Sequence, residues 1–276
     1  MQMSTRKREM RTMARRIFLA TLLATLALSS SAAGANTGWW HLPKHPTWYW
    51  QLSGKIHFGL GVKIYDVDAF STTAAQVARL HSEHVHVICY VDVGTAENWR
   101  PDYSQFPPST LGATNGWPGE VWLDIRQLGA LEPIMAARFR LCREKGFDAV
   151  EPDNMEAALN ESGFPITLAQ QLAYNEWVAE AVHSLHMAVL QKNDSEQTPQ
   201  ENAFFDGALS EECNQYWPEC GAYLPYLERG RPVLNAEYKL TTQKFCAADA
   251  LAGISGARFN LALNGRRFEP CWETGV

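Results

Sequence analysis

Acidic and aromatic residues recur in pairs, two positions apart, at the ends of short apolar runs in this sequence. The pairs are Asp66 and Asp68, Tyr90 and Asp92, and Glu151 and Asp153. Residues two apart on a β-strand share a face, so each pair could point into one cavity. A cavity with two opposed carboxyl groups can cleave a glycosidic bond: one group attacks the sugar or activates water, and the other protonates the leaving oxygen.

Two carboxylates on separate runs are the strongest candidates for this chemistry. Asp153 ends the fourth apolar run and Glu211 ends the sixth, so they could face each other across the mouth of a barrel. A single strand-end carboxylate is more typical of a helix cap or a surface ion pair. The recurrence at six strand ends instead favours an active site, where burial would raise the pKa of the acid.

Other residues at the same ends could bind a sugar. The polar ones are Asn154, Lys192, Asn193, Glu212, Glu237 and Tyr238. Aromatic rings offer flat apolar faces for sugar stacking, although packing in the core is their usual role. The aromatic candidates near strand ends or in a long connection are Trp48, Trp50, Trp99, Trp117, Trp122 and Tyr238.

Three other chemistries fit the sequence less well. Lys192 could form a Schiff base, but substrate binding or pairing with a carboxylate is the more usual role. His81, His84 and His86 resemble a metal cluster, yet they flank or lie in a predicted strand and H-E-x-x-H is absent, so we expect no metal. A G-x-S-x-G elbow and a phosphate-binding loop are also absent, which disfavours esterases and kinases, and we expect no cofactor.

Eight short apolar runs alternate with stretches of helical spacing. This alternation predicts a single-domain (β/α)₈ TIM-type barrel, an α/β fold. An open doubly wound sheet is the main alternative, but the glycine-rich first turn of that fold is missing. The predicted strands are Trp48–Leu52, Val62–Asp66, Val85–Val91, Asp148–Glu151, Met187–Gln191, Gly207–Ser210, Val233–Ala236 and Arg258–Ala262.

The connections differ in character. Thr72–His81 and Thr167–Leu185 carry apolar residues at helical spacing, and each starts with a threonine that could cap the helix. The stretch Gly94–Asp124 contains four prolines and several glycines, so we predict a long loop over one mouth of the barrel.

The N-terminus has the order of a secretory signal peptide. Six basic residues precede an apolar run from Ile17 to Leu28, and small residues follow up to Ala35. This run of about twelve residues is too short for a membrane span, which needs roughly twenty. We therefore predict a signal peptide over 1–35, a barrel domain over 36–276, and a secreted protein with no membrane partner.

The charge of the chain changes when the leader is removed. Residues 1–35 hold six of the 24 Lys and Arg residues but one of the 30 Asp and Glu residues, so the remaining 18 basic and 29 acidic residues give a formal charge of −11. An acidic chain of this kind argues against nucleic acid and suits solubility or a cationic partner. About 240 residues match one barrel, so we expect one domain. We also expect a monomer.

The six cysteines predict three disulfides in an exported chain. Sequence alone allows 15 pairings. Cys213 and Cys220 are close enough to close one small loop, and for the others we predict Cys89 with Cys142 and Cys246 with Cys271. No C-x-x-C spacing points to zinc instead.

An ordered series of motifs from about Trp48 to Tyr238 resembles glycoside hydrolase family 114, which contains endo-α-1,4-polygalactosaminidases. The motifs are Trp48-x-Trp50-Gln51-Leu52, Tyr65-Asp66-x-Asp68, Cys89-Tyr90, Arg100-Pro101-Asp102, Trp122-Leu123-Asp124-Ile125-Arg126, Gly146-Phe147-Asp148-x-x-Glu151-Pro152-Asp153-Asn154, Lys192-Asn193, Glu211-Glu212-Cys213 and Glu237-Tyr238.

The resemblance implies a barrel that hydrolyses galactosaminogalactan-type polymers, whose free amines make them cationic. It implies Asp153 as nucleophile and Glu211 as acid/base, with Glu212 as the alternative because a one-residue slip of register exchanges faces. A retaining reaction is expected if the carboxyl groups lie about 5–5.5 Å apart, and an inverting one near 8 Å. The residues expected to bind substrate are Trp50, Asp66, Asp68, Tyr90, Asp92, Trp122, Asp124, Glu151, Asn154, Lys192, Asn193, Glu237 and Tyr238.

Two alternatives stay open at this point. The barrel could hydrolyse another α-linked polysaccharide, because many activities share this fold. It could also be a carbohydrate-binding barrel without activity, which would need the aromatic residues but not two opposed carboxylates.

Overall fold

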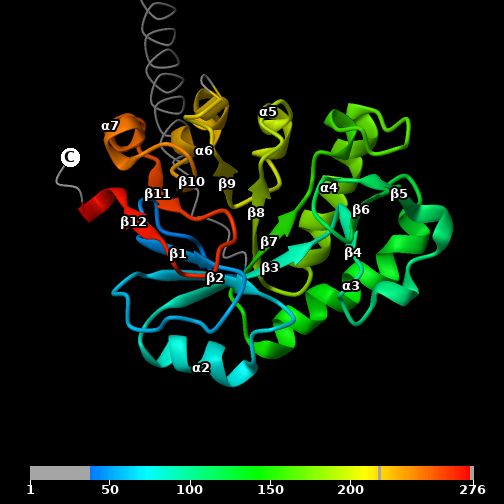
Figure 1. The fold of residues 1–276 in the computed structure, drawn as a ribbon, viewed down its shortest axis with the longest axis horizontal. Helices are drawn as coiled ribbons and strands as arrows, with labels where there is room; N and C mark the ends of the chain where they lie inside the picture. Colours follow the sequence, from blue (N-terminus) through cyan, green and yellow to red (C-terminus); the bar gives the residue numbers. More distant parts are fainter. Residues whose placement is uncertain (1–37, 217–218, 274–276) are drawn as a thin grey trace, which may run out of the picture. The chain divides into compact units, whose positions relative to one another are not determined.

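Eight parallel strands form the barrel in the computed structural model, which describes residues 38–216 and 219–273 (Figure 1). The predicted signal peptide lies outside the described residues. The strands pair in chain order, and a ninth strand, β12 (Phe268–Pro270), runs antiparallel to the last of them. The eight are β1 (Trp48–Gln51), β2 (Ile64–Asp68), β3 (His86–Asp92), β7 (Ala149–Asp153), β8 (Ala188–Lys192), β9 (Gly207–Glu211), β10 (Val233–Glu237) and β11 (Ser255–Phe259).

The first and eighth strands of the barrel, β1 and β11, meet through hydrogen bonds of a side chain and of the residues that follow the strands. The indole of Trp48 donates to the carbonyl of Ser255 at 2.7 Å, and the amide of Leu52 donates to the carbonyl of Leu263 at 2.9 Å. Strands β1 and β11 are therefore neighbours, and the barrel is nearly closed. The predicted barrel fold is confirmed, and the open sheet is excluded.

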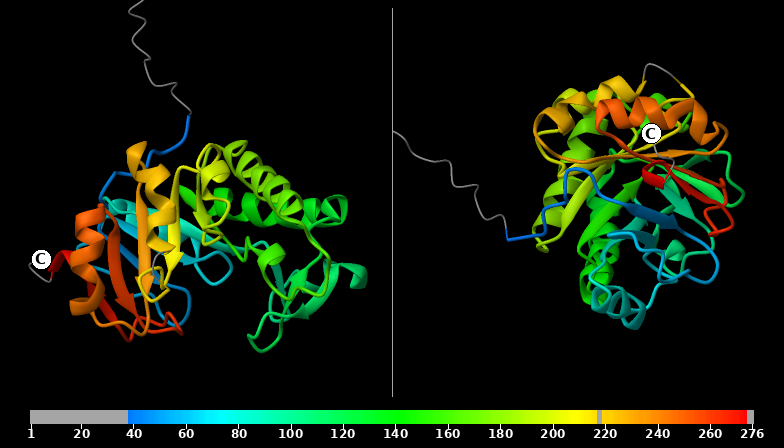
Figure 2. Two further views of the ribbon diagram at one scale, coloured as in Figure 1. Left: turned by 90° about the horizontal axis from the view of Figure 1, so that it is seen from above. Right: turned by 90° about the vertical axis from the view of Figure 1, so that its left-hand side faces the viewer.

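Helices follow the strands on the outside of the barrel (Figures 1 and 2). They are α2 (Ala74–Ser82), α3 (Leu128–Lys145), α4 (Leu168–His183), α5 (Thr198–Glu201), α6 (Leu224–Glu228) and α7 (Thr242–Ala252). Thr73 and Thr167 cap α2 and α4, each in a capping box with the glutamine three positions on. Residues 52–63, between β1 and β2, form no helix.

Two expectations about elements differ from the structure. Strand β11 begins three residues before the predicted Arg258, because its first residues, Ser255 and Gly256, are not apolar. Gly256 is required there, since a Cβ would lie 2.1 Å from Asp249 Oδ2. The sequence analysis gave no residue range for helix α3. This helix contains Pro133 as its sixth residue, where the missing amide removes the helical hydrogen bond to the Gly129 carbonyl.

The prediction that Gly94–Asp124 is a loop without regular structure was wrong. This insert forms an antiparallel sheet of three short strands, in the order β4 (Thr95–Glu97), β6 (Glu120–Leu123) and β5 (Leu111–Thr114). Its prolines lie in the connections, where they break no ladder hydrogen bond. Strands of three or four residues are too short to show an alternating pattern in the sequence.

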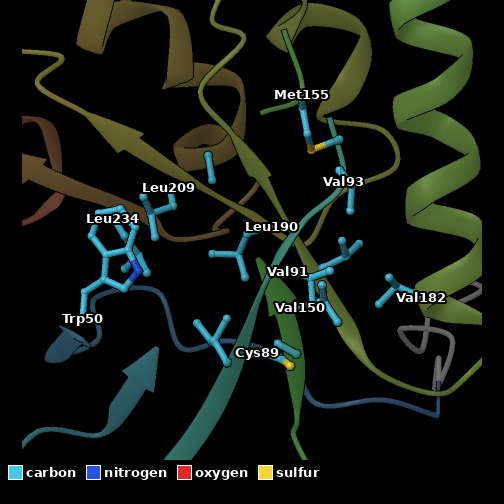
Figure 3. Close-up of a cluster of buried hydrophobic side chains, with 14 of the residues drawn as sticks. Trp50, Cys89, Val91, Val93, Val150, Met155, Val182, Leu190, Leu209 and Leu234 are labelled. Atoms are coloured by element: carbon cyan, nitrogen blue, oxygen red, sulfur yellow. The ribbon is translucent and has the colours of Figure 1, made fainter. Parts of the chain in front are cut away.

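The core fills the barrel and the space between the barrel and its helices. Figure 3 shows part of it, including Trp50 on β1, Leu190 on β8, Leu209 on β9 and Leu234 on β10, all almost fully buried. Such interiors are packed layers of side chains rather than channels. The catalytic residues of a barrel therefore lie above the core, at the carboxyl ends of the strands.

Three disulfides tie the outer parts to the barrel. Cys89 on β3 bonds Cys142 on α3, Cys213 bonds Cys220 after β9, and Cys246 on α7 bonds Cys271 after β12. These pairings confirm the predicted ones. None of the described helices is long and apolar enough to cross a membrane.

Candidate active site

A cavity of about 570 Å³ opens at the carboxyl ends of the barrel strands. Strands β1, β2, β3, β7, β8 and β9 and the insert contribute to its wall. The predicted site residues that line it are Trp50, Asp68, Tyr90, Asp153, Asn154, Lys192, Asn193, Glu211 and Tyr238. These residues are far apart in the sequence, and the barrel brings them together.

Lys192 lies at the centre of the polar residues of this cavity and is almost fully buried. Its Nζ lies 2.8 Å from Glu151 Oε1, 2.8 Å from Asp153 Oδ1 and 3.3 Å from Glu211 Oε2. We call Lys192 and these three carboxylates the lysine cluster. The contacting oxygens of Asp153 and Glu211 are therefore no more than about 6 Å apart, the sum of their two distances to Nζ.

The lysine cluster fixes opposite charges on Lys192 and Asp153. Burial alone would lower the pKa of Lys192, but the carboxylates of Asp153, Glu151 and Glu211 raise it well above its usual value. Burial alone would raise the pKa of Asp153, but the Lys192 charge and the hydrogen bonds from Lys192 and Tyr90 lower it. The Tyr90 hydroxyl donates to Asp153 Oδ2 at 2.8 Å. Asp153 is thus ionised, and Lys192 has no free electron pair for a Schiff base.

Glu211 and Glu212 point in different directions. Asn193 Nδ2 donates to Glu211 Oε2 at 3.0 Å, and the Tyr238 hydroxyl donates to Glu211 Oε1. Glu212 instead pairs with the exposed Lys239 at 3.0 Å and does not line the cavity. Successive residues at a strand end face opposite sides, so only Glu211 shares the cavity with Asp153.

Asp66 and Glu151 lie in a layer below the cavity. Both are fully buried, and neither lines the cavity wall. Each is the first member of a pair two residues apart, and two residues of strand span roughly 6.6 Å, so the second members, Asp68 and Asp153, reach the cavity and the first do not. Burial raises the pKa of Glu151 to about 7, and burial beside Glu151 raises the pKa of Asp66 well above its usual value.

Three further predicted substrate-binding residues do not line the cavity. Glu237 is buried and accepts from the Asn214 amide at 2.9 Å, on the side of β10 opposite Tyr238. Trp122 is buried in the core. Asp124 is held by Arg126, with Nε 2.6 Å from its Oδ1. Each of these residues is buried or paired with a protein group away from the cavity. A position at a strand end is therefore not enough to place a side chain in the cavity.

The insert contributes cavity residues that the sequence analysis did not assign to a site. Glu97, Arg100 and Glu120 line the wall, together with Trp99 and Trp117, which are 54% and 50% exposed. The two tryptophans were aromatic candidates. The acidic residues carried no periodic signal, because their strands are too short.

Asp92 belongs to a second acidic group, which we call the insert cluster. Asp92, Glu97 and Glu120 each offer one oxygen within 4.8 Å of the others. Their oxygens are already bonded to Thr95, Asn115, Asn154 and Arg100. Burial, followed by the neighbouring carboxylates, raises the pKa of Asp92 well above its usual value. These hydrogen bonds hold the three carboxyl groups close together.

Glu156 is another cavity residue that the sequence analysis missed. It lies three positions after Asp153, and its Oε2 is buried without a hydrogen-bond partner. Burial, followed by the charge of Asp153, raises its pKa well above the usual value. No motif or strand pattern marked this residue, because it follows the strand in an irregular loop.

Two of the three histidines that resembled a metal cluster, His81 and His86, contact one carboxylate. His81 Nε2 and His86 Nδ1 lie 2.9 and 3.3 Å from Asp148 Oδ2. Asp148 directly precedes β7, so this contact is at the amino ends of the strands, away from the cavity. The histidines connect α2 and β3 to the base of the barrel.

Comparison with known proteins gives one family and several related folds. A model of the glycoside-hydrolase family GH114 matches residues 29–272. The crystal structure of Aspergillus fumigatus Ega3 in complex with galactosamine is 31% identical, covers 84% of this chain and 97% of its own, and has a TM-score of 0.79. No match was found among curated protein sequences.

Two more distant structures share the fold alone. The glycoside hydrolase domain of PelA from Pseudomonas aeruginosa is 11% identical and has a TM-score of 0.63, with 80% of this chain and 97% of that chain covered. TtGalA, an α-galactosidase from Thermus thermophilus, is 12% identical with a TM-score of 0.51, covering 79% of this chain and 58% of its own.

Proposed function

Since this chain belongs to glycoside hydrolase family GH114 and is a glycoside hydrolase, we propose that it is a secreted endo-enzyme that cleaves α-1,4-linked galactosamine polymers with retention of configuration. Family membership removes the alternative of a barrel without activity. The similar Ega3 structure is a complex with galactosamine, which supports an aminosugar polymer as substrate.

The geometry of Asp153 and Glu211 carries the proposal. Their oxygens on Lys192 lie within about 6 Å of each other at the cavity wall. Retaining enzymes hold their two carboxyl groups about 5–5.5 Å apart, and inverting enzymes about 6.5–9.5 Å. This limit, which applies to the two oxygens that contact Lys192, supports retention.

The first chemical step starts from the ionised state that the lysine cluster imposes on Asp153. Ionised Asp153 attacks the anomeric carbon, and Glu211 transfers a proton to the leaving glycosidic oxygen as the carbon–oxygen bond breaks. Lys192 and Tyr90 each donate to one oxygen of Asp153. They keep the carboxylate charged and fix its orientation, so that the attack needs little rearrangement.

The second step releases the sugar. Glu211, now ionised, removes a proton from a water molecule that attacks the anomeric carbon, and the bond to Asp153 breaks. Asn193 and Tyr238 hold Glu211 by donating to its two oxygens.

Replacement of the two carboxylates tests the function. Asp153→Asn and Glu211→Gln should each lower the release of reducing ends from partly deacetylated galactosaminogalactan by about 10³-fold or more. Unchanged thermal unfolding of both variants would show that the fold is intact. A fully active Asp153→Asn variant, or release from α-glucans but not from galactosamine polymers by the wild type, would contradict the proposal.

Export is the remaining part of the proposal. The three disulfides support an oxidising compartment, and the predicted leader ends at Ala35. Mass spectrometry of protein from the culture medium should give a chain that begins at Asn36 and has lost six thiols. A protein recovered only from the cytosol with its N-terminus intact would contradict export.

A further inference from the structure

The Glu156 side chain lines the catalytic cavity, and its carboxyl group has no hydrogen-bond partner from the protein. Its Oε2 is buried and accepts no hydrogen bond, and its side chain contributes to the cavity wall beside Asp153 and Lys192. A buried carboxyl oxygen without a partner destabilises the folded protein, so it calls for an explanation, and a bound ligand is one.

The other carboxylates of the cavity wall are all bonded to protein groups. Asp68 and Glu97 share Arg100, and Asp153 and Glu211 share Lys192. Glu120 accepts from Thr95, Asn115 and Asn154. Among the described residues of this wall, Glu156 is therefore the carboxylate with neither an ion pair nor a hydrogen bond to its side chain.

The loop after β7 holds Glu156 in this position. Asn154 adopts a positive φ of 62°, and the next side chain, Met155, is fully buried, so the chain turns sharply after Asp153. Asn175 on α4 donates to the Met155 carbonyl at 2.9 Å, and the Leu159 amide donates to the Glu156 carbonyl at 3.0 Å. The position of Glu156 is thus set by anchored backbone and not by a contact of its own carboxylate.

Gly94 allows this turn to pack against the end of β3. A Cβ at position 94 would lie 1.6 Å from the Asn154 carbonyl oxygen. Both Val93 and Gly94 donate their amides to the Asp153 carbonyl, at 3.1 and 3.2 Å. The backbone around the reactive carboxylate and Glu156 is therefore one bonded unit.

The charges around Glu156 favour a cation as its partner. The carboxylates of Asp153, Asp194 and Glu211 act on it electrostatically and are opposed by Lys192. Lys192 contacts three other carboxylates and makes no ion pair with Glu156. A compact ammonium group beside this carboxyl group would offset the effect of burial, lower its pKa and let it ionise as an ion-pair partner, whereas a neutral acetamide supplies no charge.

We propose that Glu156 binds the protonated amine of a galactosamine residue beside the cleavage site and thereby selects deacetylated units. This inference rests on the proposed function, because it assigns the specificity of that same cavity. Glu156 touches the substrate but takes no part in bond breaking. The reaction itself needs only Asp153 and Glu211.

Comparing two polymers tests this role. Glu156→Gln keeps the size of the side chain and removes its charge, and exposed Glu161 in the same loop provides the matched control, Glu161→Gln. For Glu156→Gln we expect kcat/KM to fall about tenfold or more on fully deacetylated polygalactosamine, the range of a charged hydrogen bond. On a highly N-acetylated polymer the change should stay within about twofold. An equal loss on both polymers would overturn the inference.

Binding of single sugars separates this inference from the proposed function. Calorimetry should show that the wild type and Glu161→Gln bind galactosamine more tightly than galactose, and that Glu156→Gln loses the difference. If the wild type cleaves neither polymer, the proposed function fails, and the sugar preference still decides the role of Glu156. Equal affinity of the wild type for galactosamine and galactose would overturn that role.

Discussion

Two groups of buried carboxylates lie at the carboxyl ends of the barrel strands, and they differ in the cation within their reach. The lysine cluster surrounds Lys192, whose charge lowers the pKa of Asp153 against the effect of burial. The insert cluster has Arg100 only at Glu97, and burial raises the pKa of each of its three carboxyl groups. Asp153 is thus ionised in the lysine cluster, whereas Asp92 tends to hold a proton in the insert cluster.

This difference in protonation indicates that the two clusters have different functions. An ionised carboxylate can attack a sugar, whereas a protonated one can donate a hydrogen bond but not attack. Chemistry is therefore expected at the barrel strands, and shape and binding at the insert. Four predictions test this division.

The largest effect is expected when the lysine cluster loses its cation. Lys192→Met should lower kcat/KM by about 100-fold or more near neutral pH, because Asp153, Glu151 and Glu211 lose their shared partner. The pKa of Asp153 should rise, so the acid limb of the pH profile should move to higher pH. Measuring kcat/KM against pH tests this.

The matched control for this change is Lys239→Met, since Lys239 is exposed and pairs with Glu212 outside the cavity. It should leave the profile unchanged. If the acid limb of Lys192→Met stayed where it is in the wild type, the lysine charge would not be the cause of the lowered pKa of Asp153, and the prediction would be wrong.

The second prediction concerns stability against pH. Burial raises the pKa of Glu151 and Asp194 to about 7 and of Asp249 to about 6, whereas carboxyl groups in an unfolded chain titrate near 4. Between about pH 4 and 7 the folded protein therefore binds more protons than the unfolded chain, and the free energy of unfolding falls as pH rises. The thermal midpoint should be several degrees lower at pH 8 than at pH 5.

A variant of the insert cluster sharpens this test. Asp92→Asn keeps the shape of the side chain and removes the group whose pKa is raised, so the fall in thermal midpoint should be smaller than in the wild type. A wild-type protein that is equally stable or more stable at pH 8 would contradict the assigned protonation states.

A smaller effect is expected for the exposed aromatic residues of the insert. Trp117→Ala should raise KM for a long polymer by about 2- to 10-fold and change kcat little, because a stacked ring contributes about 0.5–1.5 kcal/mol. Leu251→Ala on α7, exposed and outside the cavity wall, is the control. A fall in kcat with KM unchanged would place the ring at the reaction centre instead.

The smallest effect is expected for the neighbour of the acid/base. Glu212→Gln should change kcat/KM by less than about twofold, because Glu212 pairs with Lys239 outside the cavity wall and does not reach Asp153. Reducing-end assays beside Glu211→Gln measure the difference. A loss of activity as large as that of Glu211→Gln would instead support Glu212 as the acid/base.

The barrel could be predicted from the sequence because its strands are continuous apolar runs. Strands buried on both faces must be apolar along their length, and β3 and β8 show this clearly. The insert could not be predicted, because three- and four-residue strands give no periodic pattern. The start of β11 at Ser255 and Gly256 was missed for a similar reason, since packing against Asp249 required a residue without a side chain.

For the site, the sequence indicated which strands contribute and the structure decided which side chains reach the cavity. The rule that residues two apart share a face paired Glu151 with Asp153, but it carried no information about depth. Only the three-dimensional structure shows that Glu151 is buried below the cavity and that Asp153 lines it. Glu156 gave no signal because a turn at Asn154, and not a strand, directs it into the cavity.

By itself the sequence determined the family, the barrel and the two carboxylates proposed for catalysis, because apolar periodicity and motif order are properties of the chain. Tertiary structure alone decided which carboxylates share Lys192, which hold protons, and which one has no partner. Charge and protonation depend on distances between side chains that the chain order does not fix, and a low-dielectric interior makes those distances decisive.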